Sequence, residues 1–183
     1  MNFRISFVLF VLAAVLGGYV LFFELQKGQT REPDAPWFYN VNERDITQIS
    51  VTHLGENQTF NKQDGSWYFD NGPGSLSQVV NIDRWGGIPL LVTGPRSSRL
   101  LEENVSNLAQ FGLSEPVSHI SILLRDGRQV NVLLGDLTAD GSDNYASLEG
   151  SASVFLVDAT WGEVLNRLVS EPPVLPEAPV PSN

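Results

Sequence analysis

The feature that most constrains this chain is an uncharged, apolar run near its N-terminus. The run covers residues 5–23 and lies between Arg4 and Glu24. As an α-helix rising 1.5 Å per residue it would span about 28 Å, close to the roughly 30 Å hydrocarbon core of a bilayer. We therefore expect a transmembrane helix over 5–23, which contacts membrane lipid and follows a cytoplasmic stub at 1–4.

A cleaved signal peptide is the alternative interpretation of this run. Such a peptide has a shorter apolar region and a small-x-small cleavage site, whereas residues 20–23 are the bulky sequence Val-Leu-Phe-Phe. The sequence therefore favours a retained anchor. The positive-inside rule compares the basic residues on the two sides of the helix. Arg4 and the N-terminal amine lie on one side and Lys27 and Arg31 on the other, so the rule gives almost no preference for either orientation. The short stub and the acidic remainder favour a cytoplasmic N-terminus, with the main domain outside the cytoplasm.

Charge and composition remove several function classes. The 183 residues include 21 acidic and 11 basic side chains, and the formal net charge of −10 repels the nucleic-acid backbone. The absence of cysteine excludes disulfides, thiolate nucleophiles, iron–sulfur clusters and a lipobox anchor. Two histidines cannot build a three-histidine zinc site. We expect no nucleic-acid partner.

The remainder of the chain divides into a stalk, a domain and a tail. Residues 24–36 are polar, contain two prolines and are typical of a stalk. Residues 37–170 form the expected folded domain. Residues 171–183 contain five prolines and are expected to form a semi-rigid tail of polyproline type.

The first part of the domain has a strand pattern followed by a helix pattern. Three short strands between Ile46 and Phe69 are expected to form a meander. An amphipathic helix over 75–85 is expected to cover it and to end at Gly86-Gly87, with Pro89 preventing its resumption. Its apolar stripe would consist of Leu76, Val79, Val80 and Ile82.

The next segment predicts a capped helix and a hairpin of defined register. A short helix is expected between Asn104 and Pro116, with Asn104 or Ser106 as its N-cap and Gly112 as its left-handed C-terminal residue. In the hairpin, a three-residue loop over 125–127 keeps one face apolar. The register that it implies pairs Leu124 with Arg128, Ile122 with Val130 and Ile120 with Val132.

The last elements complete the expected fold class. Strands are predicted at 145–148 and 154–157, and a helix is predicted at about 160–169. The expected fold is α+β, with antiparallel β-meanders and hairpins covered by two or three short helices and preceded by one N-terminal transmembrane helix. The stripe of the last helix would consist of Trp161, Val164, Leu165 and Leu168.

The order of these parts is similar to that of a known family. The motifs that match are Asp64-Gly65-Ser66-Trp67, Phe111-Gly112-Leu113-Ser114-Glu115-Pro116, Arg125-Asp126-Gly127, Leu134-Gly135, Tyr145, Val154-Phe155-Leu156-Val157 and the terminal helix. Over about residues 46–169 the chain resembles the bacterial family known as domain of unknown function 4340. The resemblance implies one N-terminal membrane helix in a bacterial cytoplasmic membrane and an extracytoplasmic α+β domain. Some members accompany transporter or gliding-motility systems, and the family has no agreed catalytic residues to carry over.

No motif for nucleophilic catalysis or phosphate binding occurs in the chain, so we expect no catalytic and no cofactor-binding residues. His53 and His119 both fall on predicted strands, and ordinary structural roles are expected for them. His53 would share the apolar face of Ile49 and Val51, whereas His119 would point to the other face.

One loop resembles the start of a calcium site. The segment 136–143 places oxygen ligands at Asp136, Thr138 and Asp140, followed by Gly141. Ser147 stands where the bidentate glutamate is required, and strands flank the loop instead of helices. We expect a polar hairpin loop and no metal site.

Two aromatic groups admit two interpretations each. Residues 37–39, Trp-Phe-Tyr, either begin the domain core or belong to an interfacial aromatic belt near the membrane. Trp85, beside a predicted helix break, is either a core residue or an anchor for a partner. The core is the favoured position in both cases.

The function expected from these features is non-catalytic. The first hypothesis is a single-pass accessory or structural subunit of a larger membrane protein complex, whether respiratory, photosynthetic or transport, with integral membrane proteins as partners. The alternative is a ligand-sensing or substrate-binding auxiliary component of an ABC-type transporter. That alternative predicts a concave apolar pocket between the meander and its helix.

Overall fold

The computed structural model describes residues 16–19, 37–70 and 77–174, and every structural statement below concerns these residues. The chain divides into two units, Met1–Asp34 and Ala35–Asn183. The membrane helix expected over 5–23 lies outside the described residues except for 16–19, which are helical. None of the helices in the described ranges is both long and apolar enough to cross a bilayer. The expected stalk at 24–36 also lies outside them.

The described residues of the second unit form one antiparallel sheet. Its strand order is β4-β3-β2-β1-β6-β7-β8-β9-β5, so β1 and β6 join two halves that are each built largely of consecutive hairpins. This arrangement confirms the expected α+β class with antiparallel meanders. The strands are β1 (Ile46–His53), β2 (Glu56–Gln63), β3 (Ser66–Asp70), β4 (Gln78–Val79), β5 (Arg99–Glu102), β6 (Ser118–Leu124), β7 (Gln129–Leu137), β8 (Asp143–Leu148) and β9 (Val154–Asp158).

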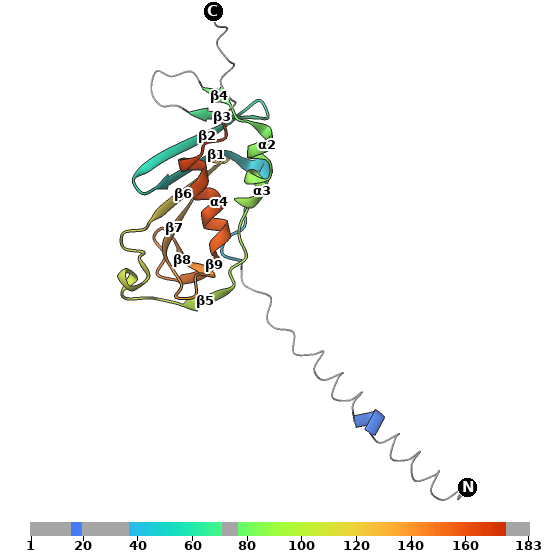
Figure 1. Ribbon diagram of the computed structural model, residues 1–183, viewed down its shortest axis with the longest axis vertical. Helices are drawn as coiled ribbons and strands as arrows, with labels where there is room; N and C mark the ends of the chain where they lie inside the picture. The colour runs from blue at the N-terminus through green and yellow to red at the C-terminus, as the bar shows by residue number, and fades with distance from the viewer. Residues whose placement is uncertain (1–15, 20–36, 71–76, 175–183) are drawn as a thin grey trace, which may run out of the picture. The chain divides into compact units, whose positions relative to one another are not determined.

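The longest described helix lies across the sheet (Figure 1). It is α4 (Ala159–Ser170), and it begins where the Asp158 carboxylate accepts a hydrogen bond of 2.8 Å from the backbone N–H of Thr160. Its predicted stripe is buried at Trp161, Leu165 and Leu168, which confirms the helix and its packing face. The shorter helical elements are η1 (Glu43–Asp45), α2 (Ile82–Trp85), α3 (Ile88–Leu91) and η2 (Leu108–Phe111).

Most of the core lies on one face of the sheet, because apolar residues alternate with polar ones along β1 and β6. Ile49 and Val51 of β1 pair with Ile122 and Ile120 of β6, and all four are fully buried. Each such side chain contributes about 1.5–3 kcal/mol through burial. The other face of the meander carries hydrogen-bonded polar pairs, such as Gln48 with Asn61 at 2.7 Å and Ser50 with Thr59 at 3.0 Å.

Aromatic rings fill the space between the meander and α2. The Trp85 ring lies 4.5 Å from the Phe60 ring and 5.3 Å from the Trp67 ring, measured between centroids. Phe69 packs on the same group, 5.8 Å from Phe60. Trp85 is only 3% exposed, so its assignment to the core is confirmed.

The aromatic residues at 37–39 also begin the domain core. Phe38 and Tyr39 are buried, and Phe38 packs 5.0 Å from Phe155. Trp37 is half exposed and stacks under the guanidinium of Arg96, whose Cζ lies 5.0 Å from the ring centroid. Burial also raises the pKa of the Tyr39 hydroxyl, which donates a hydrogen bond to the Val92 carbonyl.

The hairpin between β6 and β7 has the predicted register. Ile122 pairs with Val130 and Ile120 with Val132, and the Leu124 N–H donates to the Arg128 carbonyl. Gly127 adopts φ 84°, the left-handed conformation that a three-residue loop requires.

The prediction of a helix over 75–85 is wrong. Residues 71–76 lie outside the description, Gln78–Val79 form β4 beside β3, and only Ile82–Trp85 are helical. The helix begins there because the Asn81 side chain accepts the Asp83 N–H at 3.0 Å, and pairing of β4 with β3 satisfies the preceding backbone. Ile82 of the expected stripe is exposed, although Val80 is buried.

The expectation that Pro89 prevents a further helix is also wrong. Gly86 ends α2, as expected, and Gly87 adopts φ 85°, a left-handed conformation that separates α2 from α3. Pro89 then lies in the first turn of α3, where its missing N–H has no intrahelical partner to lose.

The helix expected between Asn104 and Pro116 is shorter than predicted. It is the 3₁₀ element η2, and its N-cap is Asn107 rather than Asn104 or Ser106. Gly112 is its left-handed C-terminal residue, as predicted. The Leu113 N–H then donates a hydrogen bond to the Leu108 carbonyl.

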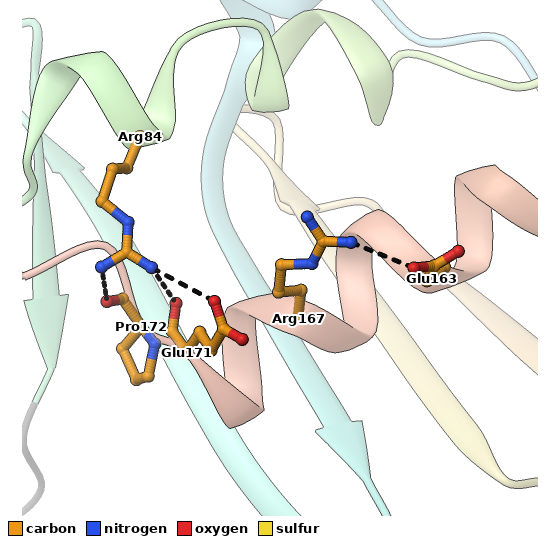
Figure 2. Close-up of polar contacts among 5 residues, drawn as sticks. All are labelled: Arg84, Glu163, Arg167, Glu171 and Pro172. Carbon is orange, nitrogen blue, oxygen red and sulfur yellow. Dashed lines mark hydrogen bonds and ion pairs between the residues drawn. The ribbon is translucent and has the colours of Figure 1, made fainter.

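The first residues of the predicted tail pack on the domain (Figure 2). The Asn81 N–H donates to the Pro173 carbonyl at 2.7 Å, and Val174 lies against the core. The Arg84 guanidinium donates to the backbone carbonyls of Pro172 and Glu171. Residues 171–174 therefore form a strap that joins α4 to α2, and the tail beyond it, 175–183, lies outside the described residues.

Replacing Gly127 by alanine is expected to destabilise the domain by about 1 kcal/mol, because a Cβ strains the left-handed conformation. Gly127→Asn should cost less, since asparagine tolerates this conformation better. Denaturant unfolding monitored by tryptophan fluorescence measures both. Equal stability of wild type and Gly127→Ala would contradict the assignment.

A chain that ends at Ser170 should be less stable than a chain that ends at Val174. The shorter chain loses the Asn81–Pro173 hydrogen bond and the packing of Val174, together worth about 1–3 kcal/mol. Thermal unfolding of the two truncated proteins tests this difference, with the full chain as reference. Identical midpoints would show that the strap adds nothing to stability.

Candidate functional site

A groove with a volume of about 690 Å³ lies along α4, where β1 and β7 end and β8 begins. We call it the α4 groove. Its walls come from distant parts of the chain, so only the folded sheet brings them together. The lining residues are His53, Val117, Gly135, Asp136, Leu137, Gly141, Asn144, Ala159, Glu163, Asn166, Arg167, Ser170 and Glu171.

A β-bulge shapes one wall of the groove. The register of β7 against β8 shifts between Leu134 and Leu137, and such an irregularity bends the strand at this point. Gly135 in the bulge lies so close to η2 that an added Cβ would stand 2.0 Å from the Phe111 carbonyl oxygen. Only glycine fits there, which fixes the path of the wall.

Apolar side chains gather at one end of the groove. Val117 and Leu137 line it and are 39% and 55% exposed. Leu54, at the turn between β1 and β2, is 77% exposed and bonds to the same segment, because its N–H donates to the Val117 carbonyl. Large apolar side chains exposed together beside a groove are typical of a docking surface.

The charged side chains of the groove have an acidic excess. Glu163 pairs with Arg167 at 3.0 Å, and Glu171 lies 3.6 Å from Arg84 of the neighbouring α2 (Figure 2). Within the described ranges, Asp136 has no ion-pair partner. Three carboxylates against one guanidinium leave the lining with a formal charge of −2 when His53 is neutral.

Asn166 contributes an unsatisfied polar atom to this region. It lines the groove from α4, and its Oδ1 is buried without a hydrogen-bond partner. Leaving a buried acceptor unpaired costs about 1–3 kcal/mol, so this atom lowers the stability of the domain.

The two histidines lie on opposite faces of the sheet, as predicted. His53 shares the face of Ile49 and Val51 and lines the groove, and its Nδ1 is 2.9 Å from the Ser118 Oγ. A serine next to a histidine is the first element of a nucleophile–base pair. Ser118, however, is 2% exposed and is not part of the groove wall, so its hydroxyl is withdrawn from that surface. His119 has a buried Nε2 without a partner.

The segment that resembles a calcium loop is a polar hairpin loop held by its own hydrogen bonds. The Asp140 carboxylate accepts hydrogen bonds from the Thr138 hydroxyl and from the backbone N–H and hydroxyl of Ser142. These bonds lower the pKa of Asp140, with the Thr138 hydroxyl as the largest cause. In the described ranges no group of three or more histidine, aspartate or glutamate side chains is arranged to hold a metal ion.

Sequence reasoning missed the groove. It singled out His53 and Asp136 for other reasons, but not Glu163, Asn166 or Arg167, which are spaced on α4 like any solvated helix face. Leu54 is the one residue that could have indicated a docking surface from the sequence. It lies in a predicted turn, where a large apolar side chain has no local structural role. Nothing in the sequence connects it to α4.

Comparison with known proteins gives one match. A family model described as Domain of unknown function (DUF4340) matches residues 92–171. These residues belong to the DUF4340 family. The match confirms the resemblance over the second half of the domain and includes β5 to β9, η2, α4 and most of the groove wall.

The first half of the domain, with β1 to β4, lies outside the matched segment, as does the Asp64–Trp67 motif. A search of curated proteins returned no match, and neither did a search of solved structures.

Removing the hydroxyl of Thr138 is expected to raise the pKa of Asp140 toward the ordinary range of a carboxyl group. In the wild type this pKa is lowered, because the hydrogen bonds favour the ionised carboxylate. These bonds therefore stabilise the loop fully at pH values above the ordinary carboxyl pKa, and the stabilisation is lost as the pH falls through the lowered pKa. Carboxyl-carbon NMR titration of wild type and Thr138→Val measures the change. Thr47→Val, which removes a hydroxyl bonded to the Leu123 carbonyl, is the control. An unchanged Asp140 titration in Thr138→Val would contradict the assigned cause.

Proposed function

We propose that this chain is a non-catalytic accessory subunit of a larger membrane protein complex. In this proposal residues 5–23 anchor it in a bacterial cytoplasmic membrane with a cytoplasmic N-terminus. The domain at 37–170 then contacts integral membrane partners from the extracytoplasmic side.

The α4 groove is the observation that carries the proposal. It combines a concave surface with exposed apolar side chains at Leu54, Val117 and Leu137, the composition found where proteins dock on one another. The apolar run at 5–23 supports the anchor, since its length matches the hydrocarbon core.

The transporter-auxiliary alternative has less support from the fold. It requires a pocket between the meander and its covering helix, and in that space the rings of Phe60, Trp67 and Trp85 are in contact. We therefore prefer the subunit role, in which the groove meets a protein surface.

Purification of the tagged full chain from native membranes in mild detergent tests the proposal. We expect a stoichiometric partner, identified by mass spectrometry, together with a particle mass well above that of one chain. A photo-crosslinking amino acid at Leu137 should join the chain to that partner. The same group at Gln63, an exposed position at the end of β2, is the control.

A chain that purifies as a free monomer, with no crosslink at position 137, would overturn the proposal. Crosslinks of equal yield from positions 137 and 63 would also count against it, because they would indicate contact without a defined docking surface.

A further inference from the structure

We propose that the α4 groove binds a cationic, partly apolar peptide segment, with a lysine or arginine side chain seated against α4. This inference rests on the proposed function, because it names the chemistry of the partner surface. The groove selects for charge through its carboxylates and for apolar contact through its rim.

The charge of the groove favours a cation. Asp136 has no ion-pair partner within the described ranges, and Glu171 lies at 3.6 Å from Arg84, long for a hydrogen-bonded ion pair. Arg167 is the single cation of the lining and is engaged by Glu163. An anionic segment would meet uncompensated carboxylates, whereas a cationic one would meet complementary charge.

The hydrogen-bonding groups point to the same occupant. The groove wall offers acceptors, namely the Oδ1 of Asn166, which has no hydrogen-bond partner, and the exposed carboxylate of Asp136. An ammonium or guanidinium group carries only donors and is matched to such a wall. A segment with a lysine or arginine therefore satisfies both the charge and the acceptors.

The apolar rim requires more than a free amine or a polyamine. Leu54, Val117 and Leu137 expose apolar surface that a small cation cannot cover. Apolar side chains flanking the cation would bury that surface, which makes a peptide segment the fitting class of ligand.

The chain's own C-terminal tail does not fit this description. Residues 172–183 contain no lysine or arginine, and Glu177 adds negative charge. The strap also leads residues 171–174 toward Asn81, the N-cap of α2. The tail therefore does not supply the occupant, and the proposal assigns the groove to a segment of a partner protein.

Binding of a defined probe tests the inference. The probe is a fluorescein-labelled decapeptide of alternating leucine and lysine, and the comparison peptide alternates leucine and glutamine. The protein is the full chain in nanodiscs of zwitterionic lipid, and the anisotropy change with empty nanodiscs is subtracted. We expect saturable binding of the lysine peptide, weakened by added salt, and much weaker binding of the glutamine peptide.

Groove variants are expected to weaken this binding. Asp136→Asn and Glu163→Gln each should reduce affinity about two- to fivefold, the size of an exposed ion pair. Asn166→Leu changes no charge and should reduce affinity about fivefold through the lost acceptor. Its thermal midpoint should equal or exceed that of the wild type, because the unsatisfied atom is removed. Glu43→Gln, at an exposed carboxylate of η1, is the control and should bind like the wild type.

Three results would overturn the inference. Equal weakening by Glu43→Gln and the groove variants would show attraction to the acidic protein as a whole. Full affinity in Asn166→Leu and Glu163→Gln would place the peptide elsewhere. Equal binding of both peptides would remove the requirement for a cation.

The native-membrane purification separates this inference from the proposed function. A partner that co-purifies equally well with wild type and with a combined Asp136→Asn, Glu163→Gln, Asn166→Leu variant would leave the subunit role standing and refute the cationic segment. A chain without any partner would refute the subunit role, whereas the peptide measurement would still decide the chemistry of the groove.

Discussion

The pairing of β1 with β6 is the interaction on which the rest of the domain depends. Each half of the sheet is built largely from local hairpins, with β5 added to the edge at β9, and the β1–β6 pairing joins the halves, with Ile49 opposite Ile122 and Val51 opposite Ile120. A shift by one residue would turn these side chains out of the core. The register of this pair therefore sets the continuous apolar face on which α4 packs.

The two faces of the sheet are completed in different ways. On one face α4, α2 and α3 bury a core that extends through both halves. On the other face the segment around η2 covers only the end near β7 to β9, where Val105, Leu113 and Val154 form a small separate cluster. The meander end of that face is polar and its side chains bond to one another, so it needs no cover.

The groove follows from this packing. α4 must lie over the sheet to bury Trp161, Leu165 and Leu168, and the flank of the helix that carries Glu163, Asn166 and Arg167 then borders the ends of β1 and β7. The bulge at Gly135 bends β7 away, so the helix and the strand end do not close on each other. The carboxylate of Asp136, which has no ion-pair partner among the described residues, and the exposed side chains of Leu54 and Leu137 are left at this opening, which is why we assign it the contact with a partner.

The sequence by itself determined the features that short-range chemistry decides. The left-handed Gly127 specified the β6–β7 register, the stripe from Trp161 to Leu168 specified α4, and the apolar run at 5–23 predicts an anchor. Tertiary structure decided the rest. Val79 belongs to a spacing of apolar residues that suits a helix, but the edge of β3 offers backbone hydrogen bonds, and Gln78–Val79 form a strand there. The groove is lined by residues more than 100 positions apart, such as His53 and Arg167. A local sequence pattern cannot predict that such residues lie close together, because the folding of the whole sheet brings them together.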